Sequence, residues 1–187
     1  MEKKEIMRRR ENREVKKETV AKAECPFPKL HPSELRRDEA YFMSHAFNEA
    51  RKAWEEDEVP VGAVVVIEGR MVARAHNQVE GLDDATAHAE MLAITQACAA
   101  IGDWRLNAAS LYVTKEPCPM CAGASIMSRL GEVIFAAADP KMGCLGGAFA
   151  VQDLPGLNHR LTVRGGVLSE PCSRLLQAYF RGKRGAG

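Results

Sequence analysis

The sequence predicts an α/β protein, a three-layer α/β/α sandwich in which helices cover both faces of a central, mixed five-stranded sheet. A β-branched run at 61–67, a tight turn and a returning strand at 71–76 predict a β-hairpin. Segments with helical and strand patterns then alternate as far as the last helix. Because a hairpin supplies antiparallel strands and helical crossovers supply parallel ones, the sheet is expected to be mixed and covered on both faces.

The elements follow one another with short connections. The first helix of the domain is expected to begin after Asp38, a good N-cap residue, with Phe42 and Ala46 on its apolar face. The helix after the hairpin is expected at about 87–100, with Thr86 as its cap. The elements predicted after it are a strand at 110–114, a helix at 119–129, a strand at 132–137, a short strand within 161–168 and a helix at 171–181.

The chain divides into a charged N-terminal extension with a Pro-rich linker, residues 1–37, and one folded domain, residues 38–187. At 187 residues the chain is long enough for one well-buried domain. Residues 1–24 hold few apolar side chains, and prolines at 26, 28 and 32 interrupt any helix. We therefore expect the extension to be flexible.

Both ends of the chain are basic, although the net charge is only +1. Residues 1–37 contain 12 Lys/Arg against 7 Asp/Glu, and residues 174–187 contain 4 Lys/Arg and no acid. Basic ends on an acidic body suit a polyanionic partner that touches the edges of the molecule. The alternative is that both ends are simply solvated tails.

The composition also indicates a compartment. The chain has no run of about twenty apolar residues and no apolar export signal. Its six cysteines lack the spacing of a disulfide framework. We therefore expect reduced cysteines and a cytoplasmic protein.

Two short motifs carry the chemistry: His88-Ala89-Glu90 and Pro117-Cys118-Pro119-Met120-Cys121. One imidazole and two thiols supply three zinc ligands and leave one position open, which is typical of a catalytic site. Glu90 is then a nearby carboxylate able to carry protons. The alternative is a structural zinc with a fourth protein ligand, for which the candidates are His76, Cys98, Cys144 and His159.

The spacing of the motifs predicts where they lie. Cys118 and Cys121 are three residues apart and share one face of a helical turn, and Pro119 suits the first helical position. Residues two apart in a helix point about 200° away from each other. His88 and Glu90 can therefore face one site only if His88 lies at the irregular start of its helix.

From residue 41 to residue 181 the chain resembles the zinc-dependent nucleoside deaminase superfamily, which has a cytidine deaminase-like fold. Within it the sequence is most similar to the bacterial deaminases that act on adenosine in tRNA. Besides the two motifs above, the resemblance rests on the segments 59–64, 76–77, 86–90, 111–114 and 155–160. It implies hydrolysis of adenosine to inosine at the wobble position of an anticodon stem-loop by a homodimer.

The resemblance also implies roles for individual residues. His88, Cys118 and Cys121 would bind one Zn²⁺ per subunit, water would be the fourth ligand, and Glu90 would shuttle protons. Base and RNA contacts would come from Val59, Pro60, Asn77, Ala89, Asp139, Lys141, Asn158, His159, Phe180 and Arg181.

Several of these base and RNA contacts also have an alternative, purely structural interpretation. Phe180 would pack the last helix, Lys141 and Arg181 would be solvated charges, and Asn77 would cap a strand end. Glu116 is expected to satisfy a helix N-terminus and to have no catalytic role.

Two rival functions remain open at this point. The runner-up is a free-base deaminase such as a guanine deaminase, which can share the Pro-Cys-Pro-Met-Cys motif. A non-enzymatic RNA-binding subunit would typically lack the glutamate, whereas Glu90 is present.

Overall fold

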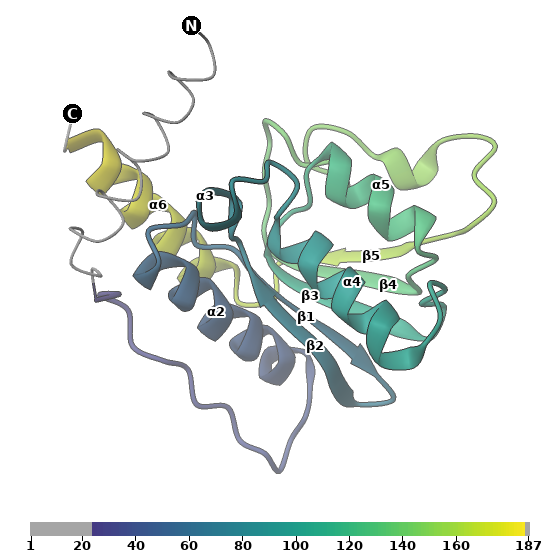
Figure 1. The fold of residues 1–187 in the computed structure, drawn as a ribbon, viewed down its shortest axis with the longest axis horizontal. Helices are drawn as coiled ribbons and strands as arrows, with labels where there is room; N and C mark the ends of the chain where they lie inside the picture. Colours follow the sequence, from purple (N-terminus) through teal and green to yellow (C-terminus); the bar gives the residue numbers. More distant parts are fainter. Residues whose placement is uncertain (1–23, 186–187) are drawn as a thin grey trace, which may run out of the picture.

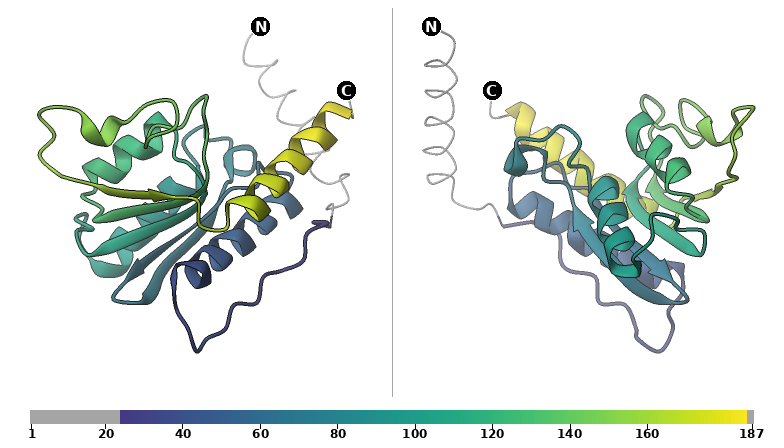
Figure 2. Two further views of the ribbon diagram at one scale, coloured as in Figure 1. Left: turned by 180° about the vertical axis from the view of Figure 1, so that it is seen from behind. Right: turned by 45° about the vertical axis from the view of Figure 1, so that its right-hand side comes forward.

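The computed structural model describes residues 24–185, and within them five strands form one sheet between two layers of helices (Figure 1). Helices α2 and α6 cover one face of the sheet, and α4 and α5 cover the other (Figure 2). The three-layer sandwich predicted from the sequence is thereby confirmed. In chain order the elements are α2 (Glu39–Glu55), β1 (Gly62–Ile67), β2 (Arg70–His76), α3 (Val79–Leu82), α4 (Ala89–Ile101), β3 (Ala109–Lys115), α5 (Pro119–Met127), β4 (Glu132–Ala137), the 3-10 helix η1 (Val151–Asp153), β5 (Thr162–Gly165) and α6 (Ser169–Gly185).

The sheet has the strand order β2-β1-β3-β4-β5 and is mixed, as expected. Strand β1 pairs antiparallel with β2 and β3, whereas β3, β4 and β5 are parallel. As a result, the start of β1 and the ends of β2, β3 and β4 lie at the same edge of the sheet. His88 lies in the segment that follows β2, and Cys118 lies in the segment that follows β3. The strand topology therefore brings the two motifs together at this edge.

Strand β1 packs directly against the backbone of α2. Val64 and Val65 at its centre are fully buried. At Gly62 a Cβ atom would lie 2.1 Å from the carbonyl oxygen of Ala46 and 2.4 Å from the amide nitrogen of Ala50. Only glycine permits this approach, and the approach brings the start of β1 close to α2.

Asp38 is the N-cap of α2, as predicted, and its carboxylate accepts a hydrogen bond from the amide of Tyr41 at 3.0 Å. The Pro-rich segment before it runs along α2 (Figure 2). The side chain of Asn48 makes two hydrogen bonds to the backbone of Leu30, at 3.0 and 2.8 Å, and Arg51 donates to the carbonyl of Phe27. The segment from 25 to 30 is thus bound to the domain. The domain boundaries stay a prediction, and residues 1–23 lie outside the described part of the chain.

The prediction of Thr86 as a helix cap is wrong. His88 is the N-cap of α4, and the amide and hydroxyl of Thr86 bind the carboxylate of Asp84 instead. The short helices α3 and η1 had no predicted counterpart, because four and three residues are too few to show a periodic pattern. No helix in the described residues is long and apolar enough to cross a membrane.

Substitution of Gly62 tests the contact between β1 and α2. We expect Gly62→Ala to lower the free energy of unfolding by about 3 kcal/mol, because the added methyl meets helix backbone that cannot move aside. Gly123→Ala is the matched control: it lies within α5, where an added Cβ would meet no atom within 4 Å apart from its chain neighbours and the backbone of its own helix, and it should raise stability by about 0.5–1 kcal/mol. Urea denaturation measures both, and equal effects would contradict the close packing at Gly62.

Candidate active site and metal centre

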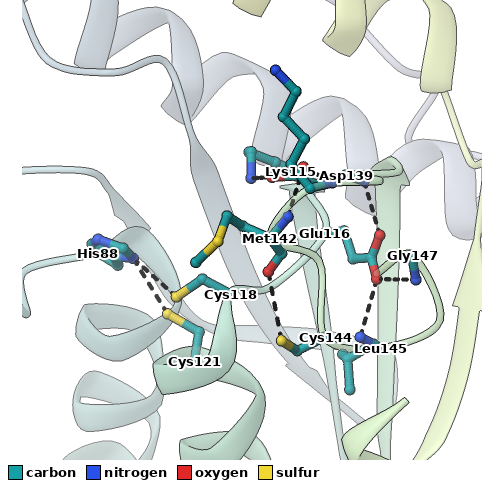
Figure 3. A network of polar contacts seen from close by, with 11 residues as sticks. His88, Lys115, Glu116, Cys118, Cys121, Asp139, Met142, Cys144, Leu145 and Gly147 are labelled. Carbon is teal, nitrogen blue, oxygen red and sulfur yellow. Dashed lines mark hydrogen bonds and ion pairs between the residues drawn. The ribbon is translucent and has the colours of Figure 1, made fainter. Parts of the chain in front are cut away.

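Three side chains from two helix N-termini form a cluster of ligand atoms. His88 and Cys118 are the N-caps of α4 and α5, and Cys121 lies in the first turn of α5. Nδ1 of His88 is 3.7 Å from Sγ of Cys118 and 3.5 Å from Sγ of Cys121 (Figure 3). In a tetrahedral zinc site, metal–nitrogen and metal–sulfur bonds of about 2.0 and 2.3 Å place these atoms about 3.5 Å apart. The three residues therefore fit a zinc ion.

The helix starts explain why these residues can converge. Pro119 occupies the first turn of α5, as predicted, so Cys118 and Cys121 share one side of it. His88 has an extended backbone conformation, with ψ at 151°, while Glu90 is already helical. The expected position of His88 at the irregular start of its helix is confirmed.

Within residues 24–185 no fourth His, Cys, Asp or Glu belongs to this group. Among the described residues, only His88, Cys118 and Cys121 bring metal-ligating atoms together as a group of three or more. Each side chain considered as a fourth ligand makes other contacts: His76 lies between two glutamates, and Cys98, Cys144 and His159 contact backbone carbonyls. A structural four-ligand zinc site is therefore not supported, and one coordination position remains for a small molecule.

The electrostatics of the cluster favour a thiolate. Contacts with Cys121 and His88 lower the pKa of the Cys118 thiol to about 3, although burial opposes this shift. The position of Cys118 at a helix N-terminus acts in the same direction. The contact with Cys118 and burial raise the pKa of Cys121, while the contact with Cys118 raises that of His88. The cluster thus carries negative charge on sulfur that a cation can neutralise.

Glu90 lies beside the ligands as a buried acid. It is in the first turn of α4, and only 4% of its surface is exposed. Burial raises its pKa above the ordinary range of a carboxyl group. Such a group holds and releases a proton more readily near neutral pH than an exposed glutamate does.

The residues expected around the base lie at the same edge of the sheet. Val59 and Pro60 precede β1, Asn77 follows β2, and Ala89 is the first residue of α4. The side chain of Asn77 donates a hydrogen bond to Glu58 at 3.1 Å. It does not cap the strand, because it is the backbone amide of Asn77 that binds the carbonyl of Val61.

Four of the six expected RNA contacts lie near the site, and two lie at the opposite edge of the sheet. Asp139 and Lys141 follow β4 at the edge that carries the ligands, and Phe180 and Arg181 are exposed on α6. Tyr179 on the same helix donates to the carbonyl of Asp57 at 2.7 Å, which places α6 beside the segment leading to Val59 and Pro60.

Asn158 and His159 lie elsewhere. They precede β5, whose first residue pairs with the first residue of β4. The ring of His159 also contacts the carbonyl of Leu130, before the start of β4. Because β3, β4 and β5 are parallel, this is the edge opposite the group of His88, Cys118 and Cys121. Within one chain the structure does not bring these two residues to the site.

Glu116 has a role that the sequence did not reveal. Its carboxylate is 1% exposed and accepts hydrogen bonds from the amides of Asp139, Leu145 and Gly147 at 2.8, 3.0 and 2.8 Å (Figure 3). A Cβ atom on Gly143 or Gly147 would lie 2.3 Å from that carboxylate. Glu116 thus organises the Gly-rich loop after β4 instead of a helix N-terminus, and it directly precedes the segment that carries Cys118.

The loop begins with a second acidic contact. One carboxylate oxygen of Asp139 pairs with Lys115, and the other accepts from the amides of Lys141 and Met142 at 2.9 and 3.1 Å. Burial would raise the pKa of Asp139, but these contacts together lower it. In the sequence, the only indication of this loop is that Asp139 is followed by Gly143, Gly146 and Gly147.

The sheet, its two helix layers and a His/Cys/Cys group beside a buried glutamate together define a deaminase. A family model described as MafB19-like deaminase matches residues 37–183. A tRNA-specific adenosine deaminase of Bacillus subtilis (strain 168) is 52% identical over 147 residues, which cover 79% of this chain and 91% of the relative. The chain therefore belongs to the deaminase family, in the branch of the tRNA-specific adenosine deaminases.

Solved structures show the same relationship. A structure from a study of A-to-I editing by tRNA:A34 deaminases at the wobble position has a TM-score of 0.71 and 43% identity, and the match covers 73% of this chain and 99% of that one. A guanine deaminase from Nitrosomonas europaea has a TM-score of 0.64 and 25% identity, covering 83% and 88%. Similarity in both sequence and structure is thus greater to the tRNA deaminases.

The buried carboxylate of Glu116 can be tested by its isosteric amide. We expect Glu116→Gln to lower the free energy of unfolding by about 1–3 kcal/mol, because the new amino group faces backbone donors. Hydrogen exchange at the amides of Asp139, Leu145 and Gly147 should accelerate. Glu170→Gln is the control, since Glu170 also precedes a Pro-Cys pair but is exposed, and its ion pair with Arg174 is 3.8 Å long. Unchanged exchange in Glu116→Gln would refute this role.

His76 should make stability depend on pH. Its ring lies 3.5 Å from Glu49 and 3.0 Å from Glu56, and the contact with Glu49 is the main cause that raises its pKa. Because the pKa of His76 is higher in the folded than in the unfolded state, its protonation stabilises the fold fully below about pH 6.5. This stabilisation is lost as the pH rises through the folded-state pKa. We expect the stability difference between wild type and His76→Gln, about 1 kcal/mol at pH 6, to shrink by pH 9 in urea denaturation. A difference that grows with pH would contradict the charged pair, and exposed His31→Gln serves as the control.

Proposed function

We propose that this chain hydrolyses adenosine to inosine at the wobble position of tRNA, with zinc as its metal. The observation that carries the proposal is the three-ligand group beside a buried glutamate, in a chain 52% identical to a tRNA-specific adenosine deaminase. The overall reaction adds water at C6 of adenine and releases ammonia.

The zinc ion would be held by His88, Cys118 and Cys121. When bound at such a site, zinc lowers the pKa of water and so supplies a nucleophile at neutral pH. The protein contributes the orientation of the ligands: both helix N-termini present them from fixed backbone positions.

Glu90 would move the protons. Buried beside the ligand group, its carboxylate would accept a proton from the attacking water and pass it to the ring nitrogen of adenine. It would then transfer the remaining water proton to the amino group at C6, so that the C6–N bond breaks and ammonia leaves. The surrounding residues, Val59, Pro60 and Ala89, would exclude bulk water and hold the base.

The substrate would approach from the edge that carries Asp139 and Lys141, with Phe180 and Arg181 of α6 beside it. A wobble base in an anticodon loop is already unpaired, so turning it into the pocket costs little. Aromatic stacking and contacts of basic side chains with phosphate would supply the remaining affinity. The exposed basic residues at the end of α6 suit such contacts.

A homodimer forms part of the proposal. The side chains of Met127, Phe149 and Leu154 are large, apolar and exposed, and they belong to α5 and to the segments flanking η1, which packs on α5. Exposed apolar side chains near one another favour association with a second copy. In such a dimer Asn158 and His159 would contact RNA only at a site other than the one formed by their own chain. We also propose a cytoplasmic location.

One experiment separates the substrate classes. An anticodon stem-loop with adenosine at the wobble position should be converted to inosine, whereas free guanine should release no ammonia. Turnover of guanine with an untouched stem-loop would favour the free-base deaminase, to which the Nitrosomonas europaea structure is the relevant relative.

Removal of the proton carrier should abolish that conversion. We expect Glu90→Gln to reduce kcat by roughly 10²–10⁴-fold, because the amide retains the shape of the side chain but cannot accept a proton. Zinc content should remain one ion per subunit, since Glu90 is not among the three ligand residues. Loss of zinc in this variant would contradict the assignment of Glu90 as a proton carrier only.

A further inference from the structure

Glu58 is a buried acid that the reaction itself does not use. Only 2% of its surface is exposed, and a buried carboxylate is costly unless its oxygens are hydrogen-bonded. Both oxygens have partners: Oε2 accepts from Nδ2 of Asn77 at 3.1 Å, and Oε1 accepts from the amide of Gly81 at 2.6 Å. The carboxylate therefore connects the segment before β1 to the end of β2 and to α3.

The backbone that carries Glu58 is itself held in place. The amide of Glu58 donates to the carbonyl of Ala53 at 2.8 Å, at the end of α2. The residue before it, Asp57, has a left-handed φ of 62°, accepts a hydrogen bond from Tyr179 and pairs with Lys183 at 2.6 Å. The carboxylate is thus presented from a rigid segment that is also bound to α6.

The hydrogen bond to Glu58 fixes the orientation of the Asn77 side-chain amide. A primary amide can turn by 180° and exchange its oxygen for its amino group, which reverses the pattern that it offers to a ligand. A carboxylate can only accept hydrogen bonds, so the amino group of Asn77 must face Glu58. The remaining oxygen and the second N–H then keep one arrangement, and the backbone amide is fixed by its bond to Val61 at 3.0 Å.

We propose that Glu58 is the positioning residue of Asn77 and, through it, a determinant of specificity for the purine. The proposal rests on the proposed function, in which Asn77 contacts the base. With Glu58 in place, the purine meets a single donor and acceptor pattern. Without the carboxylate the amide can adopt both orientations, and only one of them suits the base.

A double-mutant cycle tests whether Glu58 acts through Asn77. The substitution Glu58→Gln preserves shape but adds a donor, so kcat/KM for the wobble stem-loop should fall about tenfold, the effect of one hydrogen bond. In the Asn77→Ala background the same substitution should change kcat/KM by less than twofold. A purely structural role would lower kcat/KM equally in both backgrounds, and that result would overturn the proposal.

The control is Glu56→Gln, which changes another carboxylate of the same segment. Glu56 contacts His76 and makes no hydrogen bond to Asn77 among the described residues. Its effect on kcat/KM should be within twofold of wild type. A tenfold loss in this variant as well would show that the segment is sensitive in general and would overturn the specific role of Glu58.

A second measurement does not depend on activity. In ¹⁵N–¹H spectra the side-chain amide of Asn77, assigned by its absence in Asn77→Ala, should exchange with water slowly at one proton. Glu58→Gln should accelerate that exchange at least tenfold. An unchanged rate would refute the positioning role even if the wild type edits RNA. If the wild type leaves the stem-loop untouched, the proposed function fails, whereas this measurement still decides whether Glu58 holds Asn77.

Discussion

The meeting of two helix N-termini at one edge of the sheet is the constraint on which the site depends. Helices α4 and α5 both begin there, and their N-caps are His88 and Cys118. A helix start offers free amide groups and the positive end of the dipole, which stabilise a thiolate. It also allows a residue with extended backbone to stand directly before a helical one. His88 and Glu90, two residues apart, can therefore face the same site.

Glu58, Glu90 and Glu116 are buried at this edge, and their contacts separate their roles. Glu58 accepts two hydrogen bonds from nitrogen donors, and Glu116 accepts three. These hydrogen bonds offset the cost of burying the carboxylates, so both residues can hold the neighbouring segments in place. At Glu90 burial dominates and raises the pKa. A buried acid with a raised pKa is suited to carrying protons.

The local patterns were sufficient for most of the architecture. The β-branched run at 61–67 predicted β1, Asp38 predicted the start of α2, and the Cys-Pro pair predicted the start of α5. Thr86 was wrong as a cap because its hydroxyl has a nearer partner in Asp84, and propensity alone cannot rank two competing hydrogen bonds. The structural roles of Glu58 and Glu116 were not predicted, because their hydrogen-bond partners lie 19 to 31 residues away in the chain.

The sequence by itself determined the fold class and singled out His88, Cys118, Cys121 and Glu90 as candidate site residues, because these depend on periodicity and on spacings within a few residues. Only the tertiary structure decided which distant segments meet. It placed Asn77 against Glu58, closed the Gly-rich loop over Glu116, bound the Pro-rich segment to α2 and put His159 at the opposite edge of the sheet. Each of these contacts joins residues that are distant in the chain, so it depends on the packing of the sheet between its helices and not on any one segment.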